Sequence, residues 1–442
     1  MKDVLVIGGG VAGIQAALDL AEKGVKVHLV ERTPSIGGRM AQLDKTFPTM
    51  DCSICILAPK MADCADHPNI RLHTCSEVTA LEGGAGKFRA TVLKHARHVD
   101  ASKCTGCGKC TEACRMKGRI PNEFDFGLRK RGAIYLPFLQ AVPRVMNIDE
   151  KKCLFLKAGK CGDKQLCKEA CERGAIDFDQ KDETLELDVG AVIVATGFDL
   201  LDPSAMFEYG YGRLANVRTA MEYERLICAS GPTGGHLEVE PTKEHPRSMA
   251  FIQCVGARDL RRSPFCCSVC CMYATKEAVL VKEHYPDTEC TIFNVDMRAL
   301  GKGFEEFVER ARTEYGVRYV RARPGQVTED PRTKRLTVWY EDPATGRVTT
   351  MEADIVVLAT ALVPNAGTAA LAKVLGIEMD GHSFFKVTDP LMSPVESTRP
   401  GVFLAGYCET PKDIPESVAQ ASGAAAKAYE VLAREKGGAA NA

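Results

Sequence analysis

Twenty cysteines in 442 residues are the feature of this sequence most able to do chemistry, and they occur in clusters. In "CTGCGKCTEAC" four cysteines follow one another with two, two and three residues between them: Cys104, Cys107, Cys110 and Cys114. That spacing is typical of ferredoxins, in which three thiolates hold one [4Fe-4S] cluster and the fourth ligates a neighbouring cluster. Zinc is the alternative, but zinc sites usually pair two short Cys-x-x-Cys elements. The run therefore predicts iron–sulfur chemistry.

A looser set of cysteines follows this run, with gaps of seven, five and three residues: Cys153, Cys161, Cys167 and Cys171. It is similar to the second half of a two-cluster ferredoxin. By the crossover rule for such proteins, Cys171 completes the first cluster and Cys114 completes the second. The alternative is a single cluster with spare cysteines in the core.

A third group of five cysteines lies in "CVGARDLRRSPFCCSVCCMYATK". Cys267 and Cys270 alone, as Cys-x-x-Cys, are typical of a redox disulfide. The additional Cys254, Cys266 and Cys271 favour a cluster with unusual spacing instead.

A fourth group begins in "TMDCSICILAPKM", where Cys52 and Cys55 supply two of the four thiolates that a cubane cluster needs. Cys64 and Cys75 are the nearest further cysteines, so the sequence predicts one cluster held by these four residues. The expected total is about four [4Fe-4S] clusters. Three single cysteines are expected to be small core residues: Cys228, Cys290 and Cys408.

A glycine-rich turn near the N-terminus predicts a dinucleotide site. Gly8-x-Gly10-x-x-Gly13 follows a strand and opens a helix, and Glu31 ends the next strand about 20 residues later. The first glycine permits the tight turn, the second lets a pyrophosphate approach the backbone, and the third lets helix and strand pack closely. Helix amides then hold the phosphates, and Glu31 takes the ribose hydroxyls. The alternative is a glycine-rich turn without a ligand.

The segments "GGRM" and "VATG" agree with a dinucleotide site, and FAD is favoured over NAD because the terminal "GVFLAGYC" occurs where flavoproteins close the fold over the flavin. Tyr407 and Cys408 stand where many such enzymes have an Asp. The second α/β segment has a single glycine, Gly256, in "FIQCVGARDL", so it predicts no NAD(P) site. With the "GGRM" motif taken to occupy positions 38–41, the predicted FAD contacts are Gly38, Arg39, Met40, Ala41, Thr196, Gly197 and Gly406.

These sites need elements to position them, and the sequence predicts an α/β protein with an insertion. Residues 3–31 predict a βαβ unit. Between residues 97 and 180, Cys, Gly and Lys become frequent and long apolar periodicity is absent, after which buried-strand character returns. The expected organisation is an FAD-binding domain in three parts (1–96, 181–214 and 356–436), a two-cluster ferredoxin-like insertion (97–180) and a degenerate NAD(P)H-type domain carrying a cluster (215–355).

The overall charge and hydropathy exclude some classes of partner. Lys and Arg total 57 against 58 Asp and Glu, so the balance argues against a nucleic-acid surface or a polybasic membrane patch. No apolar run approaches the roughly 18 residues of a spanning helix, and no leader precedes "KDVLVIGGG". We therefore expect a cytoplasmic protein without direct membrane insertion, in which clustered cysteines indicate metal or redox chemistry.

Several motifs closely resemble the A subunit of heterodisulfide reductase over nearly the whole chain: "GGRMAQLDKTFPTMDCSICILAPKM", "CTGCGKC", "PNEFDFGLRKRGAIYLPFLQAVP", "ASGPTGGH", "CCMYATKEAV", "GKGFEEF" and "PKDIPESVAQAS". The resemblance implies a thioredoxin-reductase-like α/β flavoprotein with two dinucleotide-binding domains and an inserted ferredoxin-like α+β domain. It also implies FAD and a role in flavin-based electron bifurcation.

The resemblance also implies roles for individual residues. The unusual cluster of the family falls on Cys254, Cys266, Cys270 and Cys271. The family lysine near flavin N5 falls on Lys276, where a cation would stabilise the reduced flavin. A solvated helix lysine is the alternative. The motif "PKDIPESVAQAS" adds three expected FAD contacts: Lys412, Asp413 and Ile414.

The expected function is an oxidoreductase subunit that carries FAD and iron–sulfur clusters in a heterodisulfide-reductase-like complex. A two-electron donor would reduce the flavin, and the two electrons would leave toward a high-potential acceptor and a low-potential, ferredoxin-like acceptor. Expected partners are other subunits of the complex, a ferredoxin, a hydrogenase-type or dehydrogenase-type donor, and a second copy of the chain. Long archaeal members have N-terminal and C-terminal extensions that this sequence lacks, so it is similar to a short form.

Three alternatives stay open at this point. The chain is also compatible with a non-bifurcating electron conduit of a quinone-interacting oxidoreductase, peripheral to a membrane complex through its partners. It is compatible with a module of a benzoyl-CoA reductase assembly. A scaffold subunit, whose clusters chiefly organise a complex, is the third.

Overall fold

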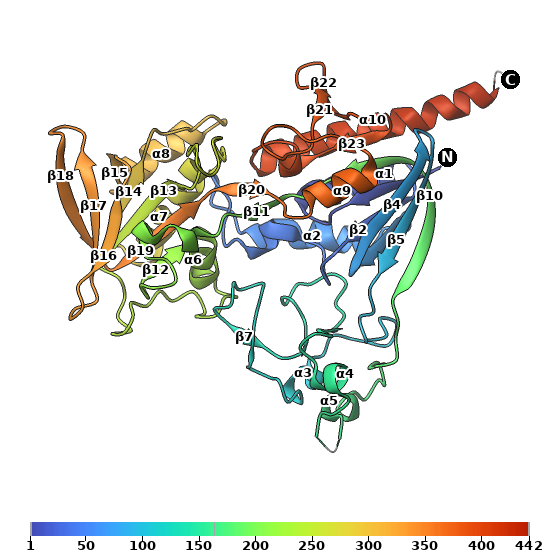
Figure 1. The fold of residues 1–442 in the computed structure, drawn as a ribbon, viewed down its shortest axis with the longest axis horizontal. Helices are drawn as coiled ribbons and strands as arrows, with labels where there is room; N and C mark the ends of the chain where they lie inside the picture. Colours follow the sequence, from blue (N-terminus) through green and yellow to red (C-terminus); the bar gives the residue numbers. More distant parts are fainter. Residues whose placement is uncertain (1, 163, 441–442) are drawn as a thin grey trace. The chain divides into compact units, whose positions relative to one another are not determined.

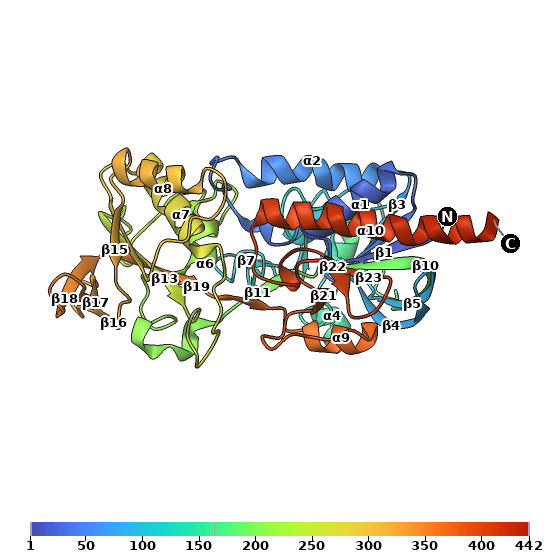
Figure 2. The same ribbon diagram turned by 90° about the horizontal axis from the view of Figure 1, so that it is seen from above.

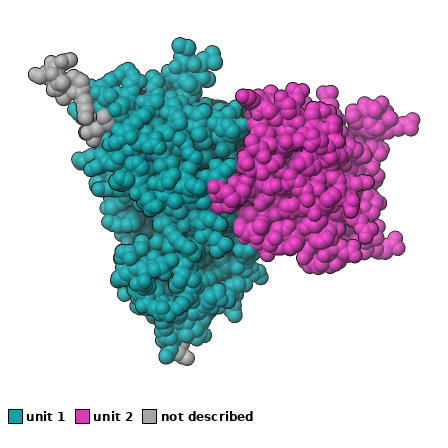
Figure 3. Space-filling view, turned by 180° about the vertical axis from the view of Figure 1, so that it is seen from behind, with its two compact units in different colours: residues 1–41, 56–198, 364–442 teal, residues 42–55, 199–363 magenta. Residues whose placement is uncertain are grey.

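The computed structural model describes residues 2–162 and 164–440, which divide into two compact units (Figures 1 and 3). Residues 42–55 belong to a different unit from the residues on either side of them. The domain organisation expected from the sequence had placed this segment with the first FAD-binding part. Unit 1 comprises residues 1–41, 56–198 and 364–442, and unit 2 comprises residues 42–55 and 199–363.

The centre of unit 1 is a mixed nine-stranded sheet, in which one path of strands runs β21-β22-β23-β10-β1-β2-β3. The parallel strands β1 and β2 at its centre are short and mostly apolar, as expected for strands buried on both faces. The antiparallel pair β4 and β5 joins the sheet through β10. The strands are β1 (Asp3–Ile7), β2 (Val27–Glu31), β3 (Ile70–Thr74), β4 (Ser76–Gly84), β5 (Lys87–Lys94), β10 (Glu183–Val194), β21 (Val387–Asp389), β22 (Ser393–Ser397) and β23 (Val402–Leu404).

Two layers cover the parallel strands of this sheet (Figure 2). The helices α1 (Val11–Glu22) and α10 (Ile414–Ala440) pack together on one face, and Ser422 Oγ donates to Asp19 Oδ2 at 2.5 Å. The β4–β5 pair and α9 (Thr368–Leu375) lie on the other face, where Leu5, Phe88 and Leu375 share one apolar core. The first βαβ unit is thus packed on both faces.

The inserted segment of unit 1 contains only short elements. Its apolar core is small and includes cysteine side chains, among them Cys110 and Cys153. The elements are α3 (Lys109–Glu112), β6 (Ile120–Pro121), β7 (Lys130–Arg131), β8 (Ile134–Tyr135), β9 (Asn147–Ile148), α4 (Leu154–Ala158) and α5 (Leu166–Glu169).

Hydrogen bonds join the insertion to the sheet layer. Ile36 N donates to Val142 O at 3.0 Å, and Val142 N donates to Ser35 Oγ at 2.9 Å. Arg97 donates to Val145 O at 3.1 Å and to Thr74 Oγ1 at 2.6 Å. The insertion is therefore bonded to the segment just before the "GGRM" motif.

Unit 2 is built on a five-stranded parallel sheet in the order β12-β19-β13-β14-β15, with an antiparallel three-stranded sheet β16-β17-β18 beside it. Its strands are β12 (Val217–Thr219), β13 (Ser248–Val255), β14 (Glu289–Asn294), β15 (Arg318–Arg321), β16 (Gln326–Glu329), β17 (Leu336–Asp342), β18 (Arg347–Ala353) and β19 (Ile355–Thr360). Its helices are α6 (Ala220–Ile227), α7 (Cys270–His284) and α8 (Phe304–Thr313).

Three further elements lie where the chain passes from one unit to the other. They are the helix α2 (Ser53–Asp66) and the paired strands β11 (Phe198–Leu200) and β20 (Leu362–Pro364). Within the described ranges, no helix is both long and apolar enough to cross a membrane.

Candidate functional site

The glycine-rich turn has the backbone that a dinucleotide loop requires. Gly8 has φ +106°, and a Cβ added there would lie 2.3 Å from Ala195 O. A Cβ on Gly13 would lie 1.8 Å from Gly8 O, so neither position accepts another residue. A Cβ on Gly10, in contrast, would meet no described atom within 4 Å. The open side of the loop is therefore at Gly10, where a pyrophosphate would approach.

Two further observations show that the loop fits a phosphate. Gly10 is the N-cap of α1, and no side chain of the described residues caps it, so the first amide groups of the helix remain available to an anion. The buried Thr196 Oγ1 has no hydrogen-bond partner in the described chain. A helix N-terminus and a buried, unpaired hydroxyl are the donors that an FAD phosphate or ribityl chain needs.

Glu31 braces the loop in this structure. Its carboxylate accepts hydrogen bonds from Gly9 N at 2.7 Å and from Thr33 N at 2.8 Å. The expected contact of Glu31 with a ribose stays a prediction.

The "GGRM" segment lies directly against the loop. Gly37 N donates to Gly9 O at 2.7 Å, and a Cβ added to Gly38 would lie 2.9 Å from Gly10 Cα. The structure thus brings the two glycines of this motif to the dinucleotide loop.

The numbering expected for this motif was wrong by one residue. The motif occupies positions 37–40, so its first glycine is Gly37 and its methionine is Met40. The methionine expected at position 41 is instead Ala41, a buried residue of the 3-10 helix Gly38–Gln42. A Cβ added to Gly37 would lie 3.2 Å from Ala41 Cβ, so the small alanine packs against the motif and is withdrawn as an FAD contact.

The C-terminal segment approaches the N-terminal end of α1. A Cβ added to Gly406 would lie 3.0 Å from Ala12 Cβ. Lys412 Nζ donates to Gly406 O at 3.3 Å and to Glu409 Oε2 at 2.7 Å. Asp413 accepts from Glu416 N at 2.8 Å and so caps α10, which begins at Ile414; burial raises the pKa of the Asp413 carboxyl.

The insertion gathers its cysteines into two sets. Burial first, and then the neighbouring Cys104, Cys171 and Cys107, raise the pKa of the Cys110 thiol to about 12. These four residues form the first cysteine set. Cys107 is exposed and Cys110 is buried, so the set reaches the surface at Cys107.

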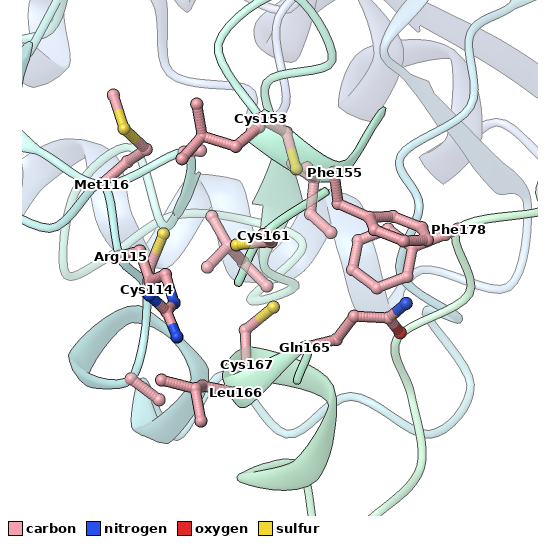
Figure 4. Close-up of a pocket in the computed structure, with 15 residues that line it drawn as sticks. Cys114, Arg115, Met116, Cys153, Phe155, Cys161, Gln165, Leu166, Cys167 and Phe178 are labelled. Carbon is pink, nitrogen blue, oxygen red and sulfur yellow. The ribbon is translucent and has the colours of Figure 1, made fainter. Parts of the chain in front are cut away.

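The second cysteine set surrounds a pocket, into which the sulfurs of Cys114, Cys153, Cys161 and Cys167 point (Figure 4). Burial and then the neighbouring Cys114, Cys153 and Cys161 raise the pKa of the Cys167 thiol to about 11. Phe155 also lines this pocket. These two sets contain the same cysteines that the crossover rule groups together. The presence of a cluster in each set stays a prediction.

Among the described residues, no group of three or more His, Cys, Asp or Glu side chains converges on a single metal ion. A cubane cluster is larger than one ion and holds its ligand sulfurs farther apart. Four cysteine thiolates remain the donor set that such a cluster uses.

The cysteines of unit 2 gather around Cys270 at the start of α7. Cys254 Sγ lies 3.9 Å from Cys270 Sγ. Hydrogen bonds of Cys254, Cys267 and Cys271 with the Cys270 sulfur raise the pKa of that thiol well above its usual value. The expected set contained Cys266 in place of Cys267. In the structure Cys267 is 1% exposed and contacts Cys270, whereas the half-buried Cys266 accepts from Ser268 N at 3.4 Å.

Lys276 is buried in an ion pair with Glu224, with side chains 1% and 2% exposed. Asp44 N donates a hydrogen bond to Glu224 Oε2 at a distance of 3.0 Å. Burial, and then the Glu224 charge, raise the pKa of Glu277 well above its usual value. The alternative of a solvated helix lysine is therefore wrong. Sequence reasoning missed Glu224, because one carboxylate on an amphipathic helix gives no signal.

The predicted cluster at Cys52, Cys55, Cys64 and Cys75 is not supported. Cys52 and Cys55 form a disulfide, and Cys55 and Cys64 are nine residues apart on α2, about 14 Å along its axis. Cys64 Sγ instead donates to Ile14 O at 3.8 Å, and burial raises the pKa of its thiol to about 12.

Cys75 is also placed apart from the others, since its thiol donates to Asn147 Oδ1 at 3.5 Å, and burial raises its pKa. Cys228, Cys290 and Cys408 are buried, in agreement with their expected core role.

The last residues of β13 and the turn after it differ from the loop in unit 1. Cys254 has φ +56°, and a Cβ added to Gly256 would lie 2.9 Å from Leu201 Cδ1. The next helix, α7, begins only at Cys270. A tight strand-to-helix turn, which presents helix amides to a pyrophosphate, is therefore not formed here.

Two family models match the segments that contain the glycine-rich loop and the first cysteine run. The family model "FAD dependent oxidoreductase" matches residues 3–50, and "4Fe-4S binding domain" matches residues 97–117. Thioredoxin reductases of Lactococcus lactis and T. acidophilum align with TM-scores of 0.52 and 0.52, at 16% and 14% identity, over 98% of this chain and 100% and 98% of theirs. The chain has this flavoprotein fold, with an FAD-type domain and a ferredoxin-type insertion.

Curated relatives match nearly the whole chain. One of the iron-sulfur A subunits of the CoB–CoM heterodisulfide reductase of Methanopyrus kandleri is 53% identical, and the A subunit of the H(2):CoB-CoM heterodisulfide,ferredoxin reductase of Methanothermobacter marburgensis is 50% identical. The alignments cover 97% and 96% of this chain but 64% and 63% of those proteins, so the chain spans a little under two thirds of their length. A protein of Archaeoglobus profundus that is named as similar to the heterodisulfide reductase A subunit is 44% identical over 98% of this chain and 67% of its own. The chain therefore belongs to the family of heterodisulfide reductase A subunits.

Proposed function

We propose that this chain is the FAD- and iron–sulfur-carrying electron-transfer subunit of a heterodisulfide-reductase-like complex. The observation that carries the proposal is the direct bonding between Val142 of the insertion and the Ser35–Ile36 segment, which precedes the "GGRM" motif at the FAD-type loop. A cysteine-rich electron module and a flavin module thus share one compact unit. The heterodisulfide and ferredoxin in the name of the Methanothermobacter marburgensis relative support two kinds of acceptor.

FAD would be held by the loop Gly8–Gly13, by Glu31, which is hydrogen-bonded to that loop, by the "GGRM" segment and by the Thr196 hydroxyl. The C-terminal Gly406 and the α10 N-terminus would cover the flavin side. When bound, FAD exchanges electron pairs with one partner and single electrons with the clusters. The chain's own contribution is to fix the loop, to supply helix amides to the phosphates and to keep the strand ends packed.

The first and second cysteine sets would each hold one [4Fe-4S] cluster. A third cluster would lie at Cys254, Cys270 and Cys271, with Cys267 or Cys266 as its fourth ligand. Cys267 is the better candidate, because its sulfur already contacts Cys270. The disulfide-bonded Cys52 and Cys55 are not included.

Lys276 follows Cys270 and Cys271 on α7. It would place a cation near the flavin, in the role that the family resemblance implies. Its buried partner Glu224 holds the ammonium group in one position. A buried cation interacts with nearby charge much more strongly than a solvated one.

The proposal is tested by purifying the complex anaerobically with its native partners and counting flavin and iron. We expect one flavin and about 12 iron atoms per chain, for three [4Fe-4S] clusters. Ferredoxin should then be reduced only while a high-potential acceptor is also being reduced. Ferredoxin reduction without that acceptor would show a plain electron conduit. One flavin with four irons or none would contradict the multi-cluster proposal.

Replacing Gly10 by Ala is expected to abolish FAD binding while preserving the fold. Its Cβ meets no described atom within 4 Å, but it would occupy the side from which the pyrophosphate approaches. The bound flavin per chain should fall at least tenfold, whereas the apoprotein should lose only about 1 kcal/mol of unfolding free energy. Gly84→Ala is the matched control, since its added Cβ also meets nothing within 4 Å. Full flavin content in Gly10→Ala would show that the pyrophosphate lies elsewhere.

A further inference from the structure

The charge of this nearly neutral chain is unevenly distributed. Residues 97–180 contain 17 Lys and Arg against 11 Asp and Glu, whereas the rest of the chain contains 40 against 47. Within the insertion, residues 150–169 alone contain six lysines against three carboxylates. The insertion is therefore a basic module within an otherwise acidic chain, and its excess is concentrated beside the second cysteine set.

Three lysines of the insertion, two of them beside the first cysteine set, are neutralised by carboxylates. Each is exposed, and each is matched by one Asp or Glu of the insertion. The three pairs are Lys103–Asp100 at 3.1 Å, Lys109–Glu172 at 2.5 Å, and Lys117–Glu112. An approaching protein would meet little net charge from these pairs.

The cations around the second cysteine set are different. Five of them are exposed, lie within four residues of Cys114, Cys153 or Cys161, and form no ion pair within the described part of the chain, whereas Lys117 and Lys164 beside the same set pair with Glu112 and Glu169. We call this group the basic face: Arg115, Lys151, Lys152, Lys157 and Lys160. Figure 4 shows Arg115 beside Cys114 at the edge of the pocket.

Apolar side chains lie within the basic face. Leu154 and Leu166, the first residues of α4 and α5, line the same pocket as the cysteines and are 39% and 38% exposed. Figure 1 shows α4 and α5 at the end of unit 1 that is remote from α10. An exposed apolar centre with a charged rim is the usual composition of a protein-binding surface.

We propose that the basic face docks a small acidic electron-carrier protein of the ferredoxin class. This inference rests on the proposed function and assigns the place and the charge of one partner. Unpaired lysines attract an acidic surface from a distance and orient it, and the exposed leucines then give a short-range apolar contact. In each encounter the carrier loses one electron and this chain gains one, or the reverse; no bond forms and no proton moves.

The test compares two variants of the anaerobically purified holoprotein that change the net charge equally. Lys157→Gln/Lys160→Gln removes two cations of the basic face, and Lys103→Gln/Lys109→Gln removes two paired cations near the first cysteine set. The probe is an acidic, oxidised two-[4Fe-4S] ferredoxin, whose dissociation constant is measured by calorimetry. At about 50 mM salt we expect the first variant to bind about tenfold more weakly and the second less than twofold. At about 500 mM salt the difference should largely disappear.

Equal weakening by both variants, or no weakening by Lys157→Gln/Lys160→Gln, would overturn the proposal. It would also be overturned if that variant lost binding to heparin or to anionic phosphatidylserine vesicles while its ferredoxin binding was unchanged. Iron and flavin are counted in every preparation. Because the carrier stays oxidised, a chain without iron would contradict the proposed function and leave the comparison of dissociation constants intact.

Discussion

The double variant Cys104→Ser/Cys171→Ser is expected to lose about four iron atoms per chain, and Cys104→Ser/Cys114→Ser about eight. In the structure Cys171 is grouped with Cys104, Cys107 and Cys110, whereas Cys114 lines the other pocket. The first double variant therefore damages one cluster twice, and the second damages two clusters once each. Iron analysis of anaerobically purified protein, supported by electron paramagnetic resonance of the reduced state, separates the two results.

The loss should extend beyond iron to the folding of the insertion. Its elements are no longer than five residues, and its small core includes Cys110 and Cys153 themselves. In small metal domains the free energy of metal binding is largely the free energy of folding. Limited proteolysis should therefore cut residues 97–180 in both variants, while bound FAD is retained.

Cys64→Ser is the control for this experiment, because the Cys64 thiol is buried against Ile14 O, away from both cysteine sets. Its iron content should equal that of the wild type. If the losses were reversed, with eight irons missing from Cys104→Ser/Cys171→Ser, the four cysteines of the sequence run would hold one cluster and the crossover would be wrong.

Lys276→Met is expected to destabilise unit 2 by about 3–5 kcal/mol, because it leaves the Glu224 carboxylate buried without its cation. The double variant Lys276→Met/Glu224→Leu should recover most of that loss, since replacing both members of a buried pair by apolar groups is often nearly neutral. The sole tryptophan, Trp339, lies on β17 in unit 2, so its fluorescence during urea unfolding reports on this unit.

Lys45→Met provides the comparison with a more exposed ion pair. Lys45 Nζ lies 2.8 Å from Glu283 Oε2, and both side chains are 29% exposed. Its loss should cost no more than about 1 kcal/mol. Equal effects of Lys45→Met and Lys276→Met would show that burial does not decide the strength of these pairs.

The same Lys276→Met protein tests the flavin role. Spectroelectrochemical titration should show shifted one-electron potentials of the flavin, because a nearby cation favours the reduced form. Unchanged potentials would remove the proposed role near N5, and the stability result would still stand.

Local patterns predicted a large part of this molecule. The loop Gly8–Gly13 could be predicted from spacing because two of its glycines meet local demands: Gly8 has φ +106°, and a Cβ on Gly13 would meet Gly8 O within the loop itself. The grouping of Cys171 with the first set also follows from a spacing rule. In such cases the spacing of the residues along the chain is enough to predict how they are arranged.

Other features depend on contacts that sequence spacing does not encode. Pro59 lies in the segment after Cys55 and would ordinarily indicate the end of a helix, yet α2 continues through it from Ser53 to Asp66. That continuity separates Cys64 from Cys55. Glu224 and Lys276 are 52 residues apart, and their pairing depends on the packing of α6 against α7.

The assignment of residues 42–55 to unit 2 means that the polypeptide crosses between units four times, at 41/42, 55/56, 198/199 and 363/364. An ordinary inserted domain has two such tethers and can be excised as one contiguous fragment. Here a fragment of residues 199–363 would leave the Glu224 carboxylate without the amide donor from Asp44. The two units are thus interlaced along the chain, and neither could be gained, lost or exchanged by a single pair of cuts.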